Sequence, residues 1–177
     1  MEKKMESQTL FKGKVITVYK DKVKCPNDKI ATREIVRHHG GVGILAIKDD
    51  KIILVKQFRY AYDQDTIEIP AGKLELNEDS QKAGARELEE ETGYSAKQFI
   101  PVTEIYPTPG YCDEIIHLYE AKDVYKVENP LACDEDEFIN VLFVPIDEAY
   151  QMVINQEIKD SKTIIAIMKA YIDKHTK

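Results

Sequence analysis

The sequence predicts an α+β fold: a mixed sheet with helices on its faces, preceded by a small N-terminal antiparallel β extension. Three observations support this prediction. Short apolar runs typical of strands stand on both sides of one charged helical segment near residues 80–92. Two further helical segments follow towards residue 177. With 177 residues, 43% of them hydrophobic, the chain can form one domain with a sizeable core.

The first third of the chain is predicted to consist of short strands joined by tight turns. Apolar or β-branched runs mark the strands, and Pro, Gly, Asn and Asp mark the turns. The predicted strands cover residues 15–19, 22–25, 30–36, 42–47 and 52–55. The first two are expected to form a hairpin around Lys20-Asp21, and Asp49-Asp50 is expected to form the turn before the fifth.

Beyond the charged helix, the pattern predicts three more strands and two helices. The strands are expected at residues 99–106, 114–121 and 138–144. A short helix is expected to begin near Asp147, and a longer one at an Asp160 or Ser161 cap. The apolar residues of the longer helix recur with helical period on one face, which is typical of a core or dimer contact.

Composition and charge disfavour several classes of protein. No apolar run approaches the roughly 18 residues of a membrane span, so no membrane partner is expected. The start, MEKKMESQTLFKGK, lacks the apolar stretch of a signal peptide. The net charge of −7 disfavours nucleic acid as a partner. Three cysteines, odd in number and without zinc spacing, are typical of reduced thiols, so a cytoplasmic location is expected.

The most informative segment runs from residue 72 to 94 and reads GKLELNEDSQKAGARELEEETGY. Asp79 or Ser80 suits the N-cap of a helix, because a short polar side chain can accept a backbone hydrogen bond there. Gly93 suits the left-handed residue that commonly ends a helix. The residues between them are therefore predicted to form a helix of about three turns.

Three glutamates of this helix, Glu87, Glu90 and Glu91, fall within one arc at 100° per residue, whereas Glu89 points away. A Glu-rich helix is ordinarily a solvated acidic face. Here the preceding loop, EIPAGK at residues 68–73, has a Pro and a Gly that favour a turn with carbonyls facing the helix. Convergent carboxylates with carbonyl oxygen suit Mg²⁺ or Mn²⁺, which completes its shell with phosphates. A phosphoric anhydride is the implied substrate.

The spacing of this segment resembles the Nudix box, G-x5-E-x7-R-E-U-x-E-E-x-G-U with U apolar, and the match is complete. Chance agreement in a chain of this length is on the order of one in a million. The resemblance to Nudix hydrolases implies an α/β/α sandwich over residues 39–177 and a dimerising β extension over residues 1–38. It also implies that the metal ligands are the carbonyl of Ala71 and the carboxylates of Glu87, Glu90 and Glu91.

Signals outside the box resemble the ADP-ribose pyrophosphatase subfamily. Pro109 stands sixteen residues after Gly93, at the offset of the subfamily's marker proline, although it also suits a plain Pro-Gly turn. Arg33 and Arg59 occupy positions similar to those that supply arginines to the substrate. A guanidinium binds two phosphate oxygens at once, but a lone Arg in a strand is more often a surface charge.

The resemblance assigns further candidates. Glu114 stands where the subfamily has a substrate-facing glutamate, and Lys73 is also a candidate for substrate binding. The acidic stretch at residues 131–138 resembles the loop that carries the catalytic base, with Glu135 as first choice and Glu137 as its rival. Glu91 is a candidate catalytic group as well as a metal ligand. The alternative for the acidic stretch is an ordinary solvated loop.

The resemblance as a whole implies Mg²⁺-dependent hydrolysis of the pyrophosphate bond of ADP-ribose to AMP and ribose 5-phosphate. One alternative is another nucleoside diphosphate sugar or a dinucleotide as substrate. A more remote alternative is a non-catalytic nucleotide-sensing domain, which the intact box disfavours. A homodimer is expected, because a few N-terminal strands alone are marginal in water and because the resemblance also implies it.

Overall fold

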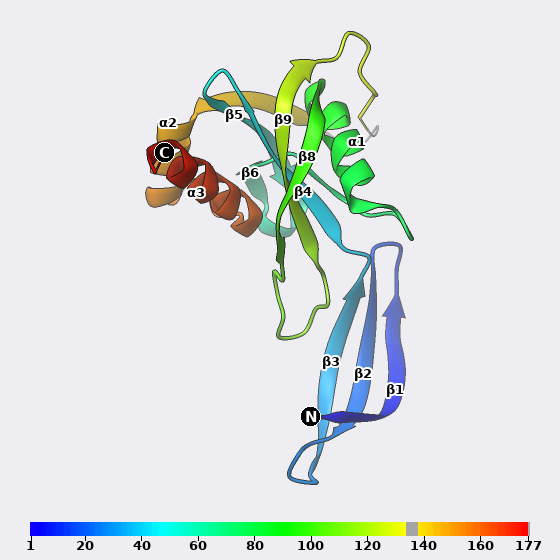
Figure 1. The fold of residues 1–177 in the computed structure, drawn as a ribbon. Coiled ribbons are helices and arrows are strands. Elements are labelled where there is room, and N and C mark those ends of the chain that lie inside the picture. The colour runs from blue at the N-terminus through cyan, green and yellow to red at the C-terminus, as the bar shows by residue number, and fades with distance from the viewer. Residues whose placement is uncertain (134–137, 177) are drawn as a thin grey trace. The chain divides into compact units, whose positions relative to one another are not determined.

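The structure, a computed structural model, describes residues 1–133 and 138–176, and the chain in it divides into two compact units (Figure 1). The first unit consists of Met1–Gly40 and Tyr106–Ile115, and the second of Gly41–Ile105 and Ile116–Lys177. The proposed division into residues 1–38 and 39–177 remains a prediction.

The first unit is built on a three-stranded antiparallel sheet in the order β1-β2-β3. Its strands are β1 (Lys3–Lys12), β2 (Ile16–Lys24) and β3 (Ile30–His38). The distant segment Tyr106–Ile115 belongs to this unit, because Val36 exchanges backbone hydrogen bonds with it. The Val36 amide donates to the carbonyl of Tyr111 at 2.8 Å, and the Asp113 amide donates to the carbonyl of Val36 at 3.1 Å.

The hairpin predicted around Lys20-Asp21 is wrong, because β2 runs through these residues without a turn. The turn lies earlier, where the Gly13 amide donates to the carbonyl of Ile16 at 2.9 Å. Asp21 is buried and accepts the Ser7 hydroxyl from β1 at 2.5 Å. Strand β1 was not predicted, since its sequence, KKMESQTLFK, is mostly polar.

The second unit is built on a mixed seven-stranded sheet in the order β10-β5-β4-β9-β8, with β6 paired to β5 and β7 paired to β4. Strands β4 and β9 are parallel, and the other pairs are antiparallel. This confirms the predicted mixed sheet; the short strands β6 and β7 were not predicted. The strands are β4 (Gly41–Lys48), β5 (Lys51–Arg59), β6 (Gln64–Glu68), β7 (Ala71–Lys73), β8 (Tyr94–Ile105), β9 (Ile116–Lys126) and β10 (Ile139–Pro145).

The predicted helices and caps are confirmed. Helix α1 (Ser80–Thr92) begins where Asp79 accepts the Lys82 amide at 3.0 Å, and it ends at Gly93 with φ of 72°. Helix α2 (Ile146–Ile154) follows β10 directly. Helix α3 (Ser161–His175) is capped by Asp160. None of the helices in the described part of the chain combines the length and apolar character needed to cross a bilayer.

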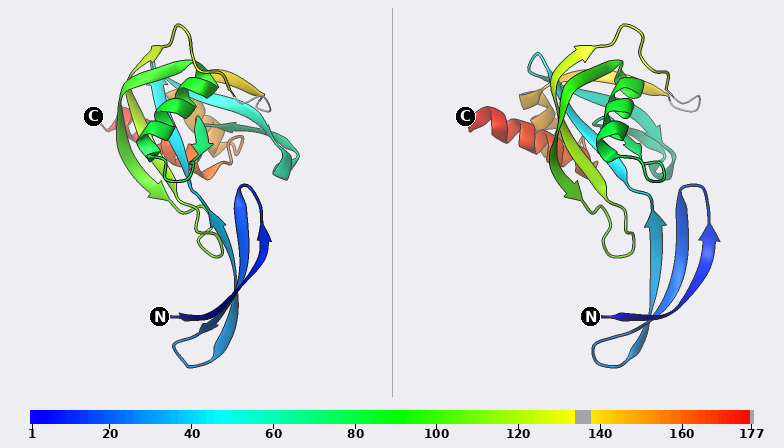
Figure 2. Two further views of the ribbon diagram at one scale, coloured as in Figure 1. Left: turned by 90° about the vertical axis from the view of Figure 1, so that its right-hand side faces the viewer. Right: turned by 45° about the vertical axis from the view of Figure 1, so that its right-hand side comes forward.

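Two apolar clusters pack on the faces of the mixed sheet, with α1 over one face and α2 and α3 over the other (Figure 2). Alternation along the central strands sends neighbouring side chains to opposite faces. Ile44 and Ile53 pack with Leu88 of α1, whereas Leu45 and Leu54 pack with residues of α3. The unit is therefore the predicted α/β/α sandwich, and the α1 side carries the box.

Candidate active site

The loop that joins β6 to β7 is held by three different elements. The Ala71 amide donates to Glu91 Oε2 of α1 at 2.9 Å. The Ile69 amide donates to the Thr163 hydroxyl of α3 at 2.8 Å, and the carbonyl of Pro70 accepts an amide of β4. These bonds fix the loop backbone directly beside the box helix.

Gly72 is required by a close approach rather than by an unusual φ. A Cβ atom at this position would lie 1.9 Å from both Cδ and Oε1 of Glu87. No side chain other than the hydrogen of glycine can occupy that space while Glu87 stays in place. The first residue of the box therefore makes room for one of its carboxylates.

Arg86 connects the carboxylates of the box. Its Nη1 donates to Glu90 Oε2 at 2.7 Å and lies 2.9 Å from Glu87 Oε1. Its Nε and Nη2 contact the two oxygens of Glu78 at 3.3 and 3.4 Å. Glu78 also accepts the Glu75 amide at 3.0 Å, so it braces both Arg86 and the loop before α1.

These contacts shift the pKa values of Arg86 and Glu78. Burial opposes the charge of Arg86, but the hydrogen bond to Glu78 and the charges of Glu87 and Glu90 outweigh it and raise its pKa. Burial raises the pKa of Glu78, and the Glu75 amide and Arg86 more than offset this and lower it. Both shifts favour the charged forms, so Arg86 and Glu78 are ionised at neutral pH.

The donor set of this region fits a hard divalent cation. Glu87 and Glu91 are buried carboxylates on α1, Glu90 is half-buried beside them, and the Ala71 backbone lies against the same helix. Oxygen donors of this kind suit Mg²⁺ or Mn²⁺. Within the described residues no three His, Cys, Asp or Glu side chains are grouped so that they could hold a metal ion, and Arg86 pairs with both Glu87 and Glu90.

Arg59, predicted to bind substrate, forms a two-point ion pair with Glu68. Its Nε and Nη2 donate to Oε1 and Oε2 of Glu68, each at 2.7 Å. Lys162 of α3 donates to Glu68 Oε2 at 2.5 Å, and the Thr66 hydroxyl donates to Oε1 at 2.7 Å. Burial raises the pKa of Glu68, but the bonds from Arg59 and Lys162 outweigh it and lower the pKa to about 2.

Three other predicted residues lie in the first unit. Arg33 donates from Nε to Glu2 Oε2 at 3.1 Å and forms a second bond through Nη2. Glu114 lies 3.6 Å from the Nδ1 of His38, and Pro109 lies in the exposed part of the Tyr106–Ile115 segment. Their roles in substrate binding remain predictions.

The remaining candidates are less well defined by the structure. Lys73 ends β7 and is exposed in the second unit. Glu135 and Glu137, the two candidates for the catalytic base, lie outside the described residues.

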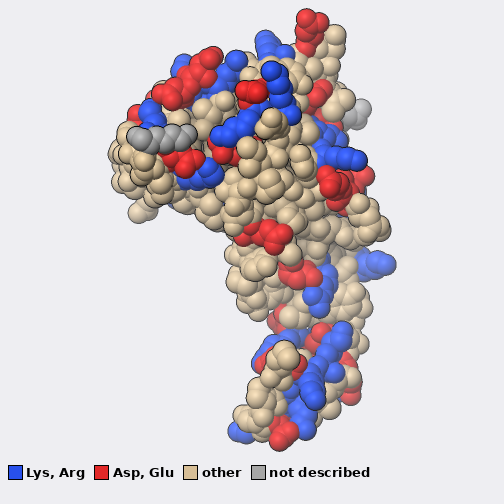
Figure 3. Space-filling model, viewed as in Figure 1, with Lys and Arg blue, Asp and Glu red and all other residues tan. Residues whose placement is uncertain are grey.

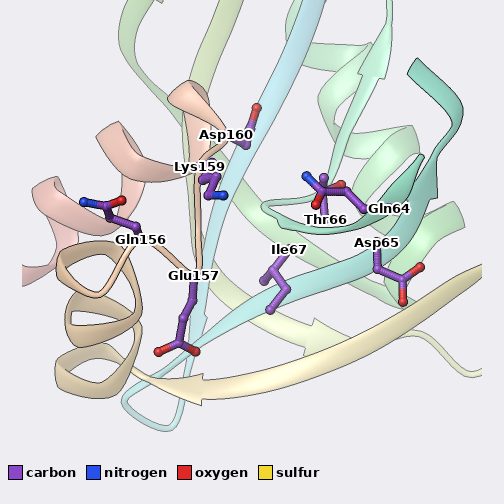
Figure 4. A pocket seen from close by; sticks show the side chains of 8 residues that line it. All are labelled: Gln64, Asp65, Thr66, Ile67, Gln156, Glu157, Lys159 and Asp160. Atoms are coloured by element: carbon purple, nitrogen blue, oxygen red, sulfur yellow. The ribbon is translucent and has the colours of Figure 1, made fainter. Parts of the chain in front are cut away.

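Elsewhere in the second unit, a pocket of about 270 Å³ opens between β6 and the segment that joins α2 to α3 (Figure 4). It is lined by Gln64, Asp65, Thr66, Ile67, Gln156, Glu157, Lys159 and Asp160. None of the predicted site residues lines it. Two of its lining residues contact the partners of Arg59: Thr66 contacts Glu68, and Asp160 contacts Lys162, which itself pairs with Glu68.

Sequence reasoning assigned no role to Glu68, Lys162 or Thr163. Lys162 contacts Glu68, and Thr163 contacts Ile69. Each of these pairs is 94 positions apart in the sequence. No spacing rule connects positions so far apart. The signal that the sequence offers is the position of Lys162, four and eight residues before Ala166 and Ala170 on the same helical face.

Known proteins resemble this chain in both sequence and fold. The NUDIX domain profile matches residues 37–166. The chain is 45% identical over 167 residues to an ADP-ribose pyrophosphatase of Bacillus subtilis, covering 94% of this chain and 90% of that protein. It is 44% identical, with the same coverage, to a methanol dehydrogenase activator of Bacillus methanolicus. A crystal structure of an ADP compounds hydrolase has the same fold, with a TM-score of 0.84, 18% identity and coverage of 98% and 95%.

Proposed function

The chain belongs to the Nudix family, and we propose that it hydrolyses the pyrophosphate bond of ADP-ribose to AMP and ribose 5-phosphate. The single observation that carries the substrate is the 45% identity, over nearly the whole length, to a protein named for that activity. The chemistry is supported by the box, since every carboxylate of the motif is present and Glu91 accepts the Ala71 amide. An intact box favours catalysis over nucleotide sensing.

Hydrolases of this family use a divalent metal ion, and we propose Mg²⁺ here, with Mn²⁺ as the substitute. The Ala71 carbonyl, Glu87, Glu90 and Glu91 are the proposed ligands. When bound, the cation supplies positive charge beside the phosphoryl oxygens and lowers the pKa of water.

The reaction needs water to attack one phosphorus while the bond from that phosphorus to the bridging oxygen breaks. A carboxylate accepts the proton of the attacking water, and a group with a pKa below neutrality can do so when it is well positioned. Glu135 is the proposed base, with Glu137 and Glu91 as rivals. Arg59, Arg33, Lys73, Pro109 and Glu114 are proposed to position the substrate.

The decisive experiment measures turnover of ADP-ribose by the purified protein with Mg²⁺, beside GDP-mannose and a dinucleotide. We expect ADP-ribose to have the highest kcat/KM. Replacement of a buried carboxylate in the box by its amide, Glu87→Gln, should lower kcat more than tenfold. Faster turnover of a different substrate would contradict the substrate assignment, and an active Glu87→Gln variant would contradict the metal assignment.

The base is identified by comparing Glu135→Gln with Glu137→Gln. The variant that lacks the base should lose kcat with little change in KM, because the base acts in the transition state and not in binding. Equal and small effects of both substitutions would favour Glu91. Hydrolysis in ¹⁸O-labelled water then shows which phosphorus is attacked.

We further propose a homodimer in which residues 1–38 take part. The first unit leaves Met5, Leu10, Phe11 and Ile30 exposed, and apolar groups of this number favour association. It has ten Lys and Arg against seven Asp and Glu, whereas the second unit has fifteen against twenty-five. Figure 3 shows basic side chains interspersed with acidic ones over the β1–β3 sheet. By these counts the two units have formal net charges of opposite sign, +3 for the first and −10 for the second.

Light scattering coupled to size-exclusion chromatography tests the dimer, which should have twice the 20.3 kDa mass of one chain. Phe11→Ser should weaken it. A wild-type mass of one chain would contradict the proposal. We also propose a cytoplasmic location, which is supported by an odd number of cysteines without zinc spacing.

A further inference from the structure

The most unusual charge in the second unit is Lys162 in the first turn of α3. It is 7% exposed, and a lysine is rarely buried unless it is paired. Its Nζ contacts Glu68 Oε2 at 2.5 Å and Asp160 Oδ1 at 3.1 Å. Its alkyl stem lies beside Gly43 of β4, where an added Cβ would be 3.6 Å from the lysine Cδ. Lys162 is thus held between two carboxylates at its ammonium group and β4 along its alkyl stem.

We propose that Lys162 is a positioning residue for substrate binding, and that it acts through Glu68 on Arg59. This inference rests on the proposed function, because it assumes that Arg59 binds a phosphate of the substrate. Lys162 itself does not touch the substrate in this proposal. It sets the orientation of the carboxylate that in turn sets the plane of the Arg59 guanidinium.

The first step is the fixed carboxylate. Glu68 has a side chain that is 5% exposed, and each of its oxygens accepts a second hydrogen bond besides the one from Arg59. Oε1 accepts the Thr66 hydroxyl and Oε2 accepts Lys162. Bonds on both oxygens stop the carboxylate from rotating about its terminal bond. Without Lys162, Oε2 of Glu68 accepts, among the described residues, only the bond from Arg59, whereas Oε1 still accepts both Arg59 and Thr66.

The second step is the free edge of Arg59. A guanidinium has five N–H donors in one plane, and the two-point pair with Glu68 uses those of Nε and one of Nη2. Nη1 has no hydrogen-bond partner among the residues that the structure describes. The side chain is 40% exposed. A fixed plane with one edge open is the arrangement that binds two phosphate oxygens at once.

A competing explanation is that Lys162 only fastens α3 to the sheet, as Thr163 does by accepting the Ile69 amide. The two explanations differ in what they predict. A purely structural lysine affects the melting temperature but not the KM for ADP-ribose. A positioning lysine affects KM, and it does so only while Arg59 is present.

The test is a double-mutant cycle between Lys162→Met and Arg59→Ala, with KM and kcat for ADP-ribose and the melting temperature as readouts. We expect Lys162→Met alone to raise KM about fivefold while kcat changes less than about twofold. In the Arg59→Ala background, Lys162→Met should change KM less than about twofold, since its route to the substrate is gone. The Kd for ADP-ribose with EDTA present should follow the same pattern.

Two further variants distinguish loss of positioning from loss of folding and from a general effect of removing a lysine from α3. Glu68→Gln/Lys162→Met removes both buried charges, and Asp160 keeps its bonds from the Thr163 amide and hydroxyl, so the variant should fold and should show the raised KM. Lys169→Met removes another ion-paired lysine of α3, whose partners are Glu120 and Asp173, and should leave KM unchanged.

The proposal is overturned if Lys162→Met raises KM equally with and without Arg59, or if KM stays unchanged while the melting temperature falls. Failure of the proposed function would look different. The wild-type protein would then prefer another substrate, and the same cycle can be run on that substrate.

Discussion

The two units of this protein contain strands of similar length, yet they bury very different amounts of side chain. In the first unit, every residue of which the structure describes, Asp21 and Val23 are the only buried side chains. In the second unit, strands β4 and β5 are buried on both faces between α1 and the pair α2 and α3. The difference teaches that strand patterns do not reveal where a core lies. The buried carboxylates Glu87 and Glu91 of the box belong to the second unit, where packing holds them.

The largest expected effect concerns the chemistry of the second unit. Glu91→Gln should lower kcat for ADP-ribose about 1000-fold, because the buried carboxylate is a proposed ligand and candidate catalytic group. Glu89→Gln, on the opposite side of the same helix, should stay within about threefold of wild type. Steady-state kinetics measure both. Similar losses in the two variants would show that the helix as a whole, and not one arc of it, matters.

Acid should destabilise the second unit through Glu68. Its pKa is lowered from 4.5 to about 2, so the contribution to stability is present above pH 4.5 and is lost as the pH falls towards 2. The linked free energy is about 3 kcal/mol. Urea unfolding between pH 7 and 2.5 should show this loss for the wild type and less of it for Glu68→Gln. Glu2→Gln, at an exposed ion pair of the first unit, should leave the pH dependence unchanged.

Substitution of Gly72 should lower activity while leaving stability nearly unchanged. Gly72→Ala places a methyl group 1.9 Å from the Glu87 carboxyl, which must move away. We expect kcat to fall about 100-fold, since a displaced carboxylate no longer supports the reaction. The melting temperature should change little, because a flexible side-chain end gives way. Gly110→Ala in the first unit has no atom within 4 Å of its new methyl group and should leave the melting temperature unchanged.

The smallest expected effect is the difference in the free energy of unfolding when the same substitution, Val to Ala, is made in each of the two sheets. Val55→Ala in β5 removes a fully buried side chain and should lower the free energy of unfolding by about 2.5 kcal/mol. Val23→Ala in β2 should cost about 1 kcal/mol, because the sheet around it is exposed. Denaturant unfolding measures both. A cost at Val23 equal to that at Val55 would mean that the dimer buries the first unit as fully as a core.

Local rules predicted the helical part of this fold well. The caps at Asp79, Gly93 and Asp160 act within one turn, so the ends of α1 and α3 follow from the residues themselves. The same reasoning failed at Lys20-Asp21. There a polar pair resembles a turn, but Asp21 is satisfied by Ser7 of a strand whose sequence shows no alternation. A strand is defined by its partner, which lies elsewhere in the chain.

The sequence by itself determined the family, the box helix and the charged arc of Glu87, Glu90 and Glu91, because these depend on spacings of a few residues. Only the tertiary structure decided that Glu68 holds Arg59, that Lys162 holds Glu68, and that the Tyr106–Ile115 segment joins the β1–β3 unit. These contacts join positions that chain topology brings together, and no periodicity encodes them. The box is therefore local in the sequence, whereas the contacts that support Arg59 are not.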